Sequence, residues 1–305
     1  MNQRNAIALM ITLFFIIAIS AVLGFSLKYL NKATSKVQND SFILQTRVVL
    51  DDVLNILKRS ADLDAIVQEN SKDALFALLS EASFIPFESS GIKVIIELKS
   101  ARAMLNVNTL VDNNGTVNIN RAQALEGYLT NYYNVNGDYI NMLVDSMSRI
   151  KEDMSYNSAI FDEKPYLFRD YIASKKHLAE INDFYAKSYN ENSLSKIDFD
   201  KLFYYSKERD SLIDVNYANA ETWRLLIGCD EGRAEELSSG AGSYATLQDL
   251  GLSEEETEAL NSFDISYYEP YLYVSVNVSQ GSMDANIHFE YDMKEKKGSN
   301  FVYEI

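Results

Sequence analysis

The residue types best suited to catalysis are scarce in this chain. It holds two histidines, His177 and His288, and a single cysteine, Cys229. His177 lies in a charged stretch with a helical pattern and His288 on the polar side of an alternating stretch, and neither has a cysteine or a second histidine near it in sequence. A zinc site or a nucleophile–histidine pair would need such groups to converge. No G-x-S-x-G, H-E-x-x-H or Walker motif occurs, so we expect no catalytic residue and no enzyme.

One short stretch offers oxygen ligands for a cation. The sequence Asp112-Asn113-Asn114-Gly115-Thr116 places oxygen-bearing side chains at alternate positions before a glycine. Such a pattern could hold calcium through Asp112 and Asn114, although the twelve-residue calcium loop is incomplete and a tight turn explains the same residues. Calcium is the one cofactor that the sequence suggests. Asn114 also begins an Asn-x-Thr triplet, and whether it is glycosylated stays open.

The composition indicates a folded, acidic protein. Its 305 residues carry 44 acidic against 28 basic side chains, a formal net charge of -16, and 47% of them are hydrophobic. That content is enough for a packed core in one or two domains. A surface of this charge repels phosphate backbones, so we expect no nucleic-acid partner. One cysteine excludes an intrachain disulfide.

The chain begins with a long apolar run. Ala6 to Leu27 contains no charged residue, and a helix of that length spans roughly 33 Å, enough to cross a bilayer. We therefore predict a transmembrane helix at residues 7–27. A cleaved secretory signal is the alternative, with a small-residue site before Ala21. Basic residues on both sides leave the orientation ambiguous, and we favour export of the long C-terminal part.

Beyond this run, the elements change from helix to strand, to helix and back to strand. Ile43, Leu50 and Val53 fall at helical spacing, so the membrane helix continues as an amphipathic helix whose apolar stripe packs on partner subunits or on its own domain. Residues 91–99 alternate as a strand, and residues 271–278, 285–291 and 301–303 read as a three-stranded antiparallel meander. The roughly 160 residues between them read mostly as helix.

This order predicts an α+β protein with an inserted domain. An edge strand cannot stay unpaired across such a gap unless the middle part folds by itself. We expect the first part of a small α/β domain at residues 28–105, an inserted all-α domain at 106–262, and the C-terminal β-meander of the first domain at 263–305.

Three stretches carry a resemblance to a known family. They are Arg4-Asn5-Ala6-Ile7-Ala8-Leu9-Met10, the phrase around Asn106-Val107-Asn108-Thr109-Leu110, and the phrase around Asn216-Tyr217-Ala218-Asn219-Ala220. In this order, the chain resembles the K-type minor pseudopilins of bacterial type II secretion systems, the general secretion pathway protein K family. Tyr217 departs from the threonine that is usual in the second phrase.

The resemblance implies a function and a set of partners. It implies a pilin-like α/β fold, a leader at residues 1–6 that prepilin peptidase removes by cleavage between Ala6 and Ile7, and methylation of the new amino terminus. Counting from Ile7, the fifth residue is Ile11, where most pilin-like subunits have glutamate, which implies a place at the tip of the pseudopilus. It further implies a single-pass protein of the bacterial inner membrane, with a cytoplasmic N-terminus and a periplasmic soluble part. Its partners would be the I- and J-type minor pseudopilins and the inner-membrane assembly platform.

Two other functions stay open at this level. One is a minor pilin of a type IV or DNA-uptake pilus, and the other is a membrane-anchored periplasmic hydrolase or binding protein. Residues 220–262 also resemble a helix-hairpin-helix module of DNA-binding proteins, but the stretch has many glutamates and only Arg224 and Arg233. Charge of this kind opposes phosphate binding, so we expect the module to serve packing. The secreted substrates and the type of filament cannot be read from the sequence.

Overall fold

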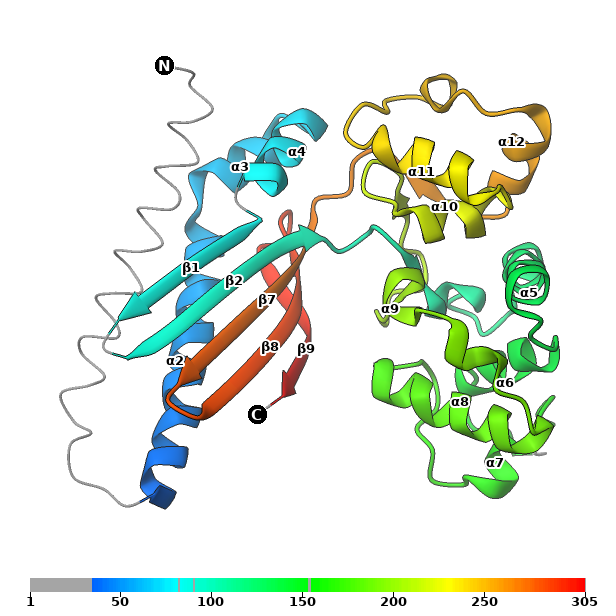
Figure 1. Ribbon diagram of the computed structural model, residues 1–305, viewed down its shortest axis with the longest axis horizontal. Coiled ribbons are helices and arrows are strands. Elements are labelled where there is room, and N and C mark those ends of the chain that lie inside the picture. The colour runs from blue at the N-terminus through cyan, green and yellow to red at the C-terminus, as the bar shows by residue number, and fades with distance from the viewer. Residues whose placement is uncertain (1–34, 82, 90, 153–154, 305) are drawn as a thin grey trace. The chain divides into compact units, whose positions relative to one another are not determined.

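The chain forms two compact units, of which one is inserted into the other. The computed structural model describes residues 35–81, 83–89, 91–152 and 155–304 (Figure 1). Unit 1 comprises Met1–Ala101 and Pro270–Ile305, and unit 2 comprises Arg102–Glu269. The predicted leader at residues 1–6 and the predicted transmembrane helix at 7–27 lie outside the described residues. Within the described part, no helix is both long enough and apolar enough to cross a membrane.

Unit 1 is built on a five-stranded antiparallel sheet. The strand order is β1-β2-β7-β8-β9. The bounds are β1 Phe84–Ser89, β2 Ile92–Ser100, β7 Tyr271–Gln280, β8 Met283–Asp292 and β9 Lys297–Glu304. β2 and β7 are hydrogen-bonded neighbours although the whole of unit 2 separates them along the chain. Gly281 forms the tight β7–β8 turn with a φ of +62°, a conformation that glycine adopts without a steric penalty.

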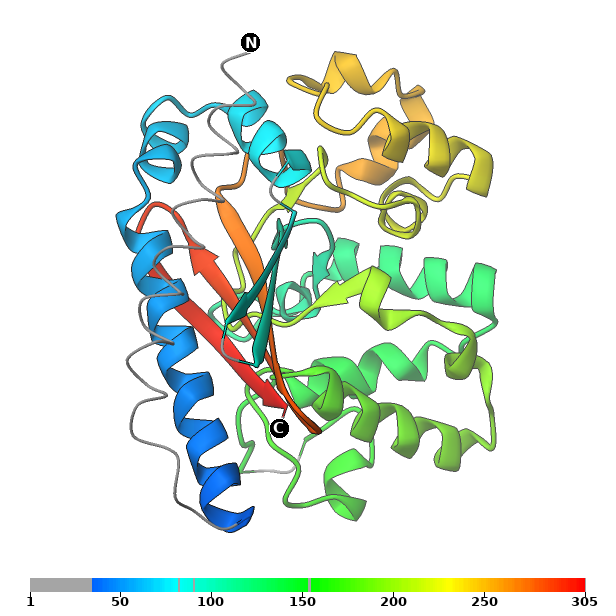
Figure 2. The same cartoon turned by 60° about the vertical axis from the view of Figure 1, so that its left-hand side comes forward.

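Period-2 alternation places one row of apolar side chains on the covered face of this sheet. Ile85 pairs with Ile96, Ile96 with Val276, and Val276 with Ile287. All four are buried. Helix α2 (Ser35–Arg59) contacts β7, β8 and β9 and runs along the sheet (Figure 2). The helix and the sheet face thus bury each other, as two-layer α+β packing requires.

The sheet of unit 1 contains one strand that the sequence analysis did not predict. β1 contains Pro86, which lacks a backbone N–H and usually argues against a strand. β1 tolerates it because it forms the outer edge of the sheet, paired only with β2. Two short helices, α3 (Ala61–Gln68) and α4 (Lys72–Glu81), precede β1, and the Ser60 hydroxyl caps α3 by accepting a bond from the Leu63 amide.

Unit 2 is mostly helical. Its α-helices are α5 Ile119–Tyr133, α6 Asp138–Ser146, α7 Ile160–Glu163, α8 Lys175–Tyr189, α9 Phe199–Leu202, α10 Ala220–Ile227, α11 Glu231–Ser239 and α12 Glu254–Leu260, and its 3-10 helices are η2 Val107–Leu110, η3 Ser193–Lys196 and η4 Leu247–Leu250. They share one continuous hydrophobic core between Leu105 and Phe263, in which Tyr139, Tyr185 and Trp223 are fully buried. Unit 2 thus has a core of its own.

Two short parallel strand pairs set the limits of unit 2. β3 (Leu105–Asn106) pairs with β4 (Phe203–Tyr204), and β5 (Ile213–Asp214) pairs with β6 (Ile265–Ser266). The Asp214 amide donates to the Arg102 carbonyl at 2.8 Å, and the Asp214 carboxylate accepts from the Glu269 amide at 2.9 Å. These bonds draw both ends of the insertion into unit 2. Unit 2 therefore extends from Arg102 to Glu269. The sequence analysis placed the limits of the inserted domain at residues 106 and 262 instead.

Candidate binding surfaces

The two histidines and the cysteine lie far from one another in sequence. The contacts of each are those of a residue that supports the fold. His177 is buried on α8, and its Nδ1 accepts a hydrogen bond from the Ala173 amide at 3.2 Å. Burial lowers the pKa of His177 and that of His288, whose ring stacks on Tyr273 with 5.6 Å between centroids. Burial also raises the pKa of the half-buried Cys229 thiol. Across the described residues, no three histidine, cysteine, aspartate or glutamate side chains are gathered as a metal would require.

The candidate calcium loop forms a tight turn. Asp112 Oδ1 accepts the backbone N–H groups of Asn114 and Thr116, both at 2.8 Å. The Gly115 amide donates to the Asp112 carbonyl at 3.0 Å, and Gly115 has a φ of +87°. The turn therefore accounts for these residue types without an ion. Calcium binding through Asp112 and Asn114 stays a prediction.

The first asparagine phrase pins loops together inside unit 2. Asn106 Nδ2 donates to the Ser206 carbonyl at 3.1 Å, while its Oδ1 accepts from the Ser206 amide at 3.2 Å. Asn108 Nδ2 donates to the carbonyls of Ile172 and Ser206, at 3.0 and 2.9 Å, and its Oδ1 accepts from the Ile172 amide at 2.7 Å. Both asparagines are buried. Each side-chain amide takes the place of a neighbouring strand, because it forms hydrogen bonds with backbone groups that no strand reaches.

The second asparagine phrase has the same structural role. Asn216 is buried, donates to the carbonyls of Tyr244 and Tyr267 at 2.9 and 2.8 Å, and accepts from the Tyr244 amide at 3.0 Å. Asn219 caps α10, since its side chain accepts from the Thr222 amide at 2.9 Å. The two phrases that carry the family resemblance thus hold the fold of unit 2.

Helix α2 is the first candidate assembly surface, and it corrects part of the sequence prediction. Leu50 and Val53 are buried within unit 1, so the prediction that they pack on partner subunits is wrong for these two residues. The reason is that their helical face lies on the sheet. Ile43 is half-buried. Among the residues of α2 whose side chains are described, from Asp40 onward, the large apolar residues that are exposed are instead Leu44 and Val48, one helical turn apart and 61% and 38% exposed.

The predicted processing and tip positions lie outside the described residues. These are Ala6 and Ile7 at the cleavage point and Ile11 at the position where a glutamate is usual. They stay predictions.

The arginines of the helix-hairpin-helix-like stretch are engaged with its own carboxylates. Arg224 forms an ion pair with Glu221 at 3.0 Å, and Arg233 forms ion pairs with Glu236 at 2.7 Å and with Glu256 at 3.2 Å. The hydroxyls of Tyr128 and Tyr133 also donate to Glu221. Arg233 therefore ties α11 to α12, and the tyrosine bonds to Glu221 tie α10 to α5. We retain the expectation that this stretch does not bind DNA.

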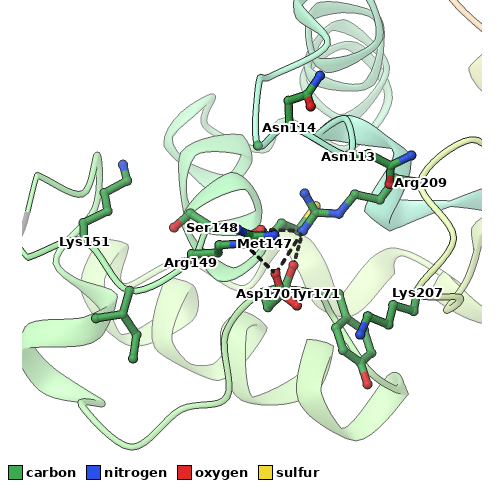
Figure 3. Close-up of a pocket in the computed structure, with 12 residues that line it drawn as sticks. Asn113, Asn114, Met147, Ser148, Arg149, Lys151, Asp170, Tyr171, Lys207 and Arg209 are labelled. Atoms are coloured by element: carbon green, nitrogen blue, oxygen red, sulfur yellow. Dashed lines mark hydrogen bonds and ion pairs between the residues drawn. The ribbon is translucent and has the colours of Figure 1, made fainter.

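A pocket on unit 2 is the second candidate surface, and the sequence analysis did not predict it. It has a volume of about 360 Å³, and Figure 3 shows residues from several loops pointing around it. Four cations and one carboxylate are among the lining residues, which are Asn113, Asn114, Gly115, Met147, Ser148, Arg149, Ile150, Lys151, Asp170, Tyr171, Lys207 and Arg209. The sequence signal was two basic-x-basic triplets, Arg149-Ile150-Lys151 and Lys207-Glu208-Arg209, which lie far apart along the chain.

Arg209 holds the loops around this pocket together. Its guanidinium donates to the backbone carbonyls of Asp112 and Met147, both at 2.8 Å, and to that of Asp170. Its side chain is only 10% exposed and lies 3.7 Å from the Asp170 carboxylate. One side chain thus joins the turn at Asp112, the end of α6 and the segment that precedes α8 (Figure 3). The pocket therefore has a fixed frame.

The comparisons with known proteins find a likeness among solved structures. No model of a known protein family matches the chain, and no curated protein matches it. Among solved structures, the chain is similar to one from the GspK–GspI–GspJ complex of the enterotoxigenic Escherichia coli type 2 secretion system. The match has 13% sequence identity and a TM-score of 0.41, and it covers 72% of this chain and 81% of that one.

Proposed function

We propose that this protein is a structural minor pseudopilin that takes part in type II protein secretion. The observation that carries the proposal is the interruption of the sheet in unit 1. β2 and β7 pair along their whole length, yet a helical unit with its own core stands between them in sequence. The family that the sequence resembles has this arrangement, with a helix before the sheet and a large helical insertion. The apolar segment at residues 7–27 would anchor such a subunit in the inner membrane, with both units in the periplasm.

The α2 surface supports an assembly function. Leu44 and Val48 form a small apolar step on the exposed side of α2, next to Arg47. Exposed apolar residues that neighbour each other on a helix are suited to packing against another helix. We propose that this step contacts the I- or J-type minor pseudopilin, in place of the buried Leu50 and Val53.

Co-purification tests this function. The full chain, with an affinity tag at its C-terminus, is expressed together with the I- and J-type subunits of its own system. The tagged protein is then purified in neutral detergent. We expect the three to elute together in equal amounts. The double variant Leu44→Ser/Val48→Ser should lose at least one partner, because it removes the apolar step without touching the core. Asn55→Ser, an exposed change on the same helix, is the matched control.

Two outcomes would contradict the proposal. If the wild-type chain elutes alone at micromolar concentration, a pseudopilin assembly is excluded. If the double variant keeps both partners in equal amounts, α2 is not the contact, although the assembly itself stands.

The processing and tip positions extend the proposal to finer detail. We propose cleavage between Ala6 and Ile7, which the intact mass of protein from its native membrane would reveal. A chain that starts at Met1 or Ala21 would contradict it. We also propose that Ile11 suits a subunit at the tip. A glutamate within the bilayer is costly without a partner, and the topmost subunit has no neighbour above to provide one. Labelled protein found all along sheared filaments would overturn the tip position.

A further inference from the structure

We propose that the basic pocket of unit 2 binds an acidic, partly apolar segment of a partner protein. The pocket is lined by Arg149, Lys151, Lys207 and Arg209 and by one carboxylate, that of Asp170. Its formal charge is therefore positive, in a chain whose net charge is -16. This proposal goes beyond the pseudopilin function and does not depend on it.

Three of the four cations can be assigned different roles from their contacts. Arg209 is occupied by three backbone carbonyls and forms the frame. Arg149 is 87% exposed, and its Nε lies 3.9 Å from Asp170, at the edge of the ion-pair range. Lys207 is exposed, and its Nζ lies 5.6 Å from the centroid of the Tyr171 ring. Arg149 and Lys207 thus have charge to offer to a ligand.

The loop that carries Arg149 and Lys151 is held at both ends. The Asp145 carboxylate is fully buried and accepts bonds from the amides of Asn157 and Ser158 at 3.1 and 2.7 Å. The Lys151 amide donates to the Tyr156 hydroxyl at 3.0 Å. Asp170 has a φ of +87°, an uncommon conformation for this residue type, held by the bonds of its backbone to Arg209 and Ser148. Backbone segments that are held by such bonds lose less entropy when a ligand binds.

An exposed apolar residue stands between two of the cations. Ile150 lines the pocket and is 77% exposed. An apolar side chain with charged neighbours suits a protein contact, in which the apolar group is buried and the surrounding charges orient the partner. A purely anionic small ligand would have no use for Ile150. The occupant that fits best therefore carries an apolar residue next to its carboxylates.

Other occupants fit less well. Sites for small molecules are mostly enclosed and apolar, whereas this pocket is half open and lined by four cations, of which Arg149 is 87% exposed. A nucleic acid needs a continuous basic stripe, and the acidic charge elsewhere on the chain would repel its backbone. The acidic surface around the pocket repels an acidic partner segment, whereas the basic pocket attracts it. The segment is therefore directed to the pocket.

Fluorescence anisotropy with the full chain in neutral detergent tests the proposal. The probe is a labelled twelve-residue peptide of alternating glutamate and serine with a central leucine. We expect saturable binding in the range of about 100 µM, weakened at least about tenfold between about 50 and 300 mM salt. Lys207→Glu should weaken binding about tenfold or more. Lys187→Glu changes the net charge equally at an exposed position near the end of α8, and it should have little effect.

Each further outcome decides for or against the site. A peptide with glutamine in place of glutamate should not bind, and replacement of leucine by serine should weaken binding. If the glutamine peptide binds equally, or if Lys187→Glu weakens binding as much as Lys207→Glu, the pocket is not an acidic-segment site. If inorganic phosphate binds at lower concentration than the peptide and depends on Lys207, the site takes small anions, and the proposal fails. Ile150→Ser tests the apolar anchor and should reduce affinity less than Lys207→Glu.

Discussion

Unit 1 and unit 2 are held together by different kinds of interaction. In unit 1, rows of apolar side chains run across the paired strands, as in Ile96, Val276 and Ile287. In unit 2, buried asparagines satisfy the backbone of loops that have no strand beside them, and Asn108 alone makes three such bonds. The sheet obtains its backbone hydrogen bonds from regular pairing, whereas the helical unit needs particular side chains to reach isolated backbone groups.

This difference predicts how each unit fails. An apolar row loses stability in proportion to the volume removed, because a cavity remains. Replacement of a buried amide side chain lowers stability for a different reason, because several buried polar groups lose a hydrogen-bond partner at once. The only tryptophan, Trp223, is buried in unit 2, so its fluorescence reports on that unit selectively.

The largest effect should follow Ile96→Ala in unit 1. The side chain is fully buried in the second strand, and we expect a loss of about 4 kcal/mol in the free energy of unfolding. Hydrogen exchange resolved by mass spectrometry should show faster exchange in β2 and β7, with the Trp223 urea transition unchanged. Lys93→Ala, on the exposed face of the same strand, is the control. An equal shift of the Trp223 transition would mean that the two units unfold together.

A somewhat smaller loss should follow Asn108→Ala in unit 2. The change leaves the amide and the carbonyl of Ile172 buried without their partner and removes one of the two side-chain bonds to the Ser206 carbonyl, at a cost of about 3 kcal/mol. The Trp223 urea midpoint should fall, while exchange in the sheet stays as in the wild type. Asn120→Ala, at an exposed position of α5, should change little. If it destabilises unit 2 as much as Asn108→Ala does, the pinning role is refuted.

Removal of one helix cap should have a still smaller effect. The Ser253 hydroxyl accepts from the Glu256 amide at 3.1 Å, and the Glu256 carboxylate accepts from the Ser253 amide at 2.8 Å. Ser253→Ala should cost about 1 kcal/mol and speed amide exchange in α12. Ser253→Asn, which keeps an acceptor, should restore most of the protection. Slow exchange in the alanine variant would show that packing, not the cap, fixes this helix.

The smallest effect concerns acid. Burial by itself raises the pKa of Glu221, but bonds from Tyr128, Tyr133 and Arg224 outweigh it and lower the pKa below the ordinary value of 4.5. A lowered pKa in the folded state stabilises unit 2 above the unfolded value, and this contribution is lost as the pH falls through the folded value. Partial exposure limits it to under about 1 kcal/mol. Urea midpoints from about pH 5 to about 3 should fall less steeply in Glu221→Gln; an unchanged slope would contradict the assignment.

The elements of unit 1 were predictable because their pattern is local. Alternation in β2, β7 and β8 follows from one covered face, and each strand shows it in a few residues. β1 was missed because Pro86 hides an edge strand, which only its place in the sheet permits. On α2, the helix was predicted, but its contact face was not resolved. Apolar residues occur on both sides of it, and Leu44 and Val48 are exposed only because the opposite side meets the sheet.

The sequence by itself determined the alternation of the strands, the acidic charge and the presence of a helical stretch between two parts of one sheet. These follow from composition and from periods of a few residues. The tertiary structure alone decided what the asparagine phrases do and where the cations gather. Arg149 and Lys207 lie on loops that are distant in sequence, and they meet at one pocket because Arg209 bonds to three separate backbone segments. Such a meeting depends on the path of the whole chain, which no local pattern records.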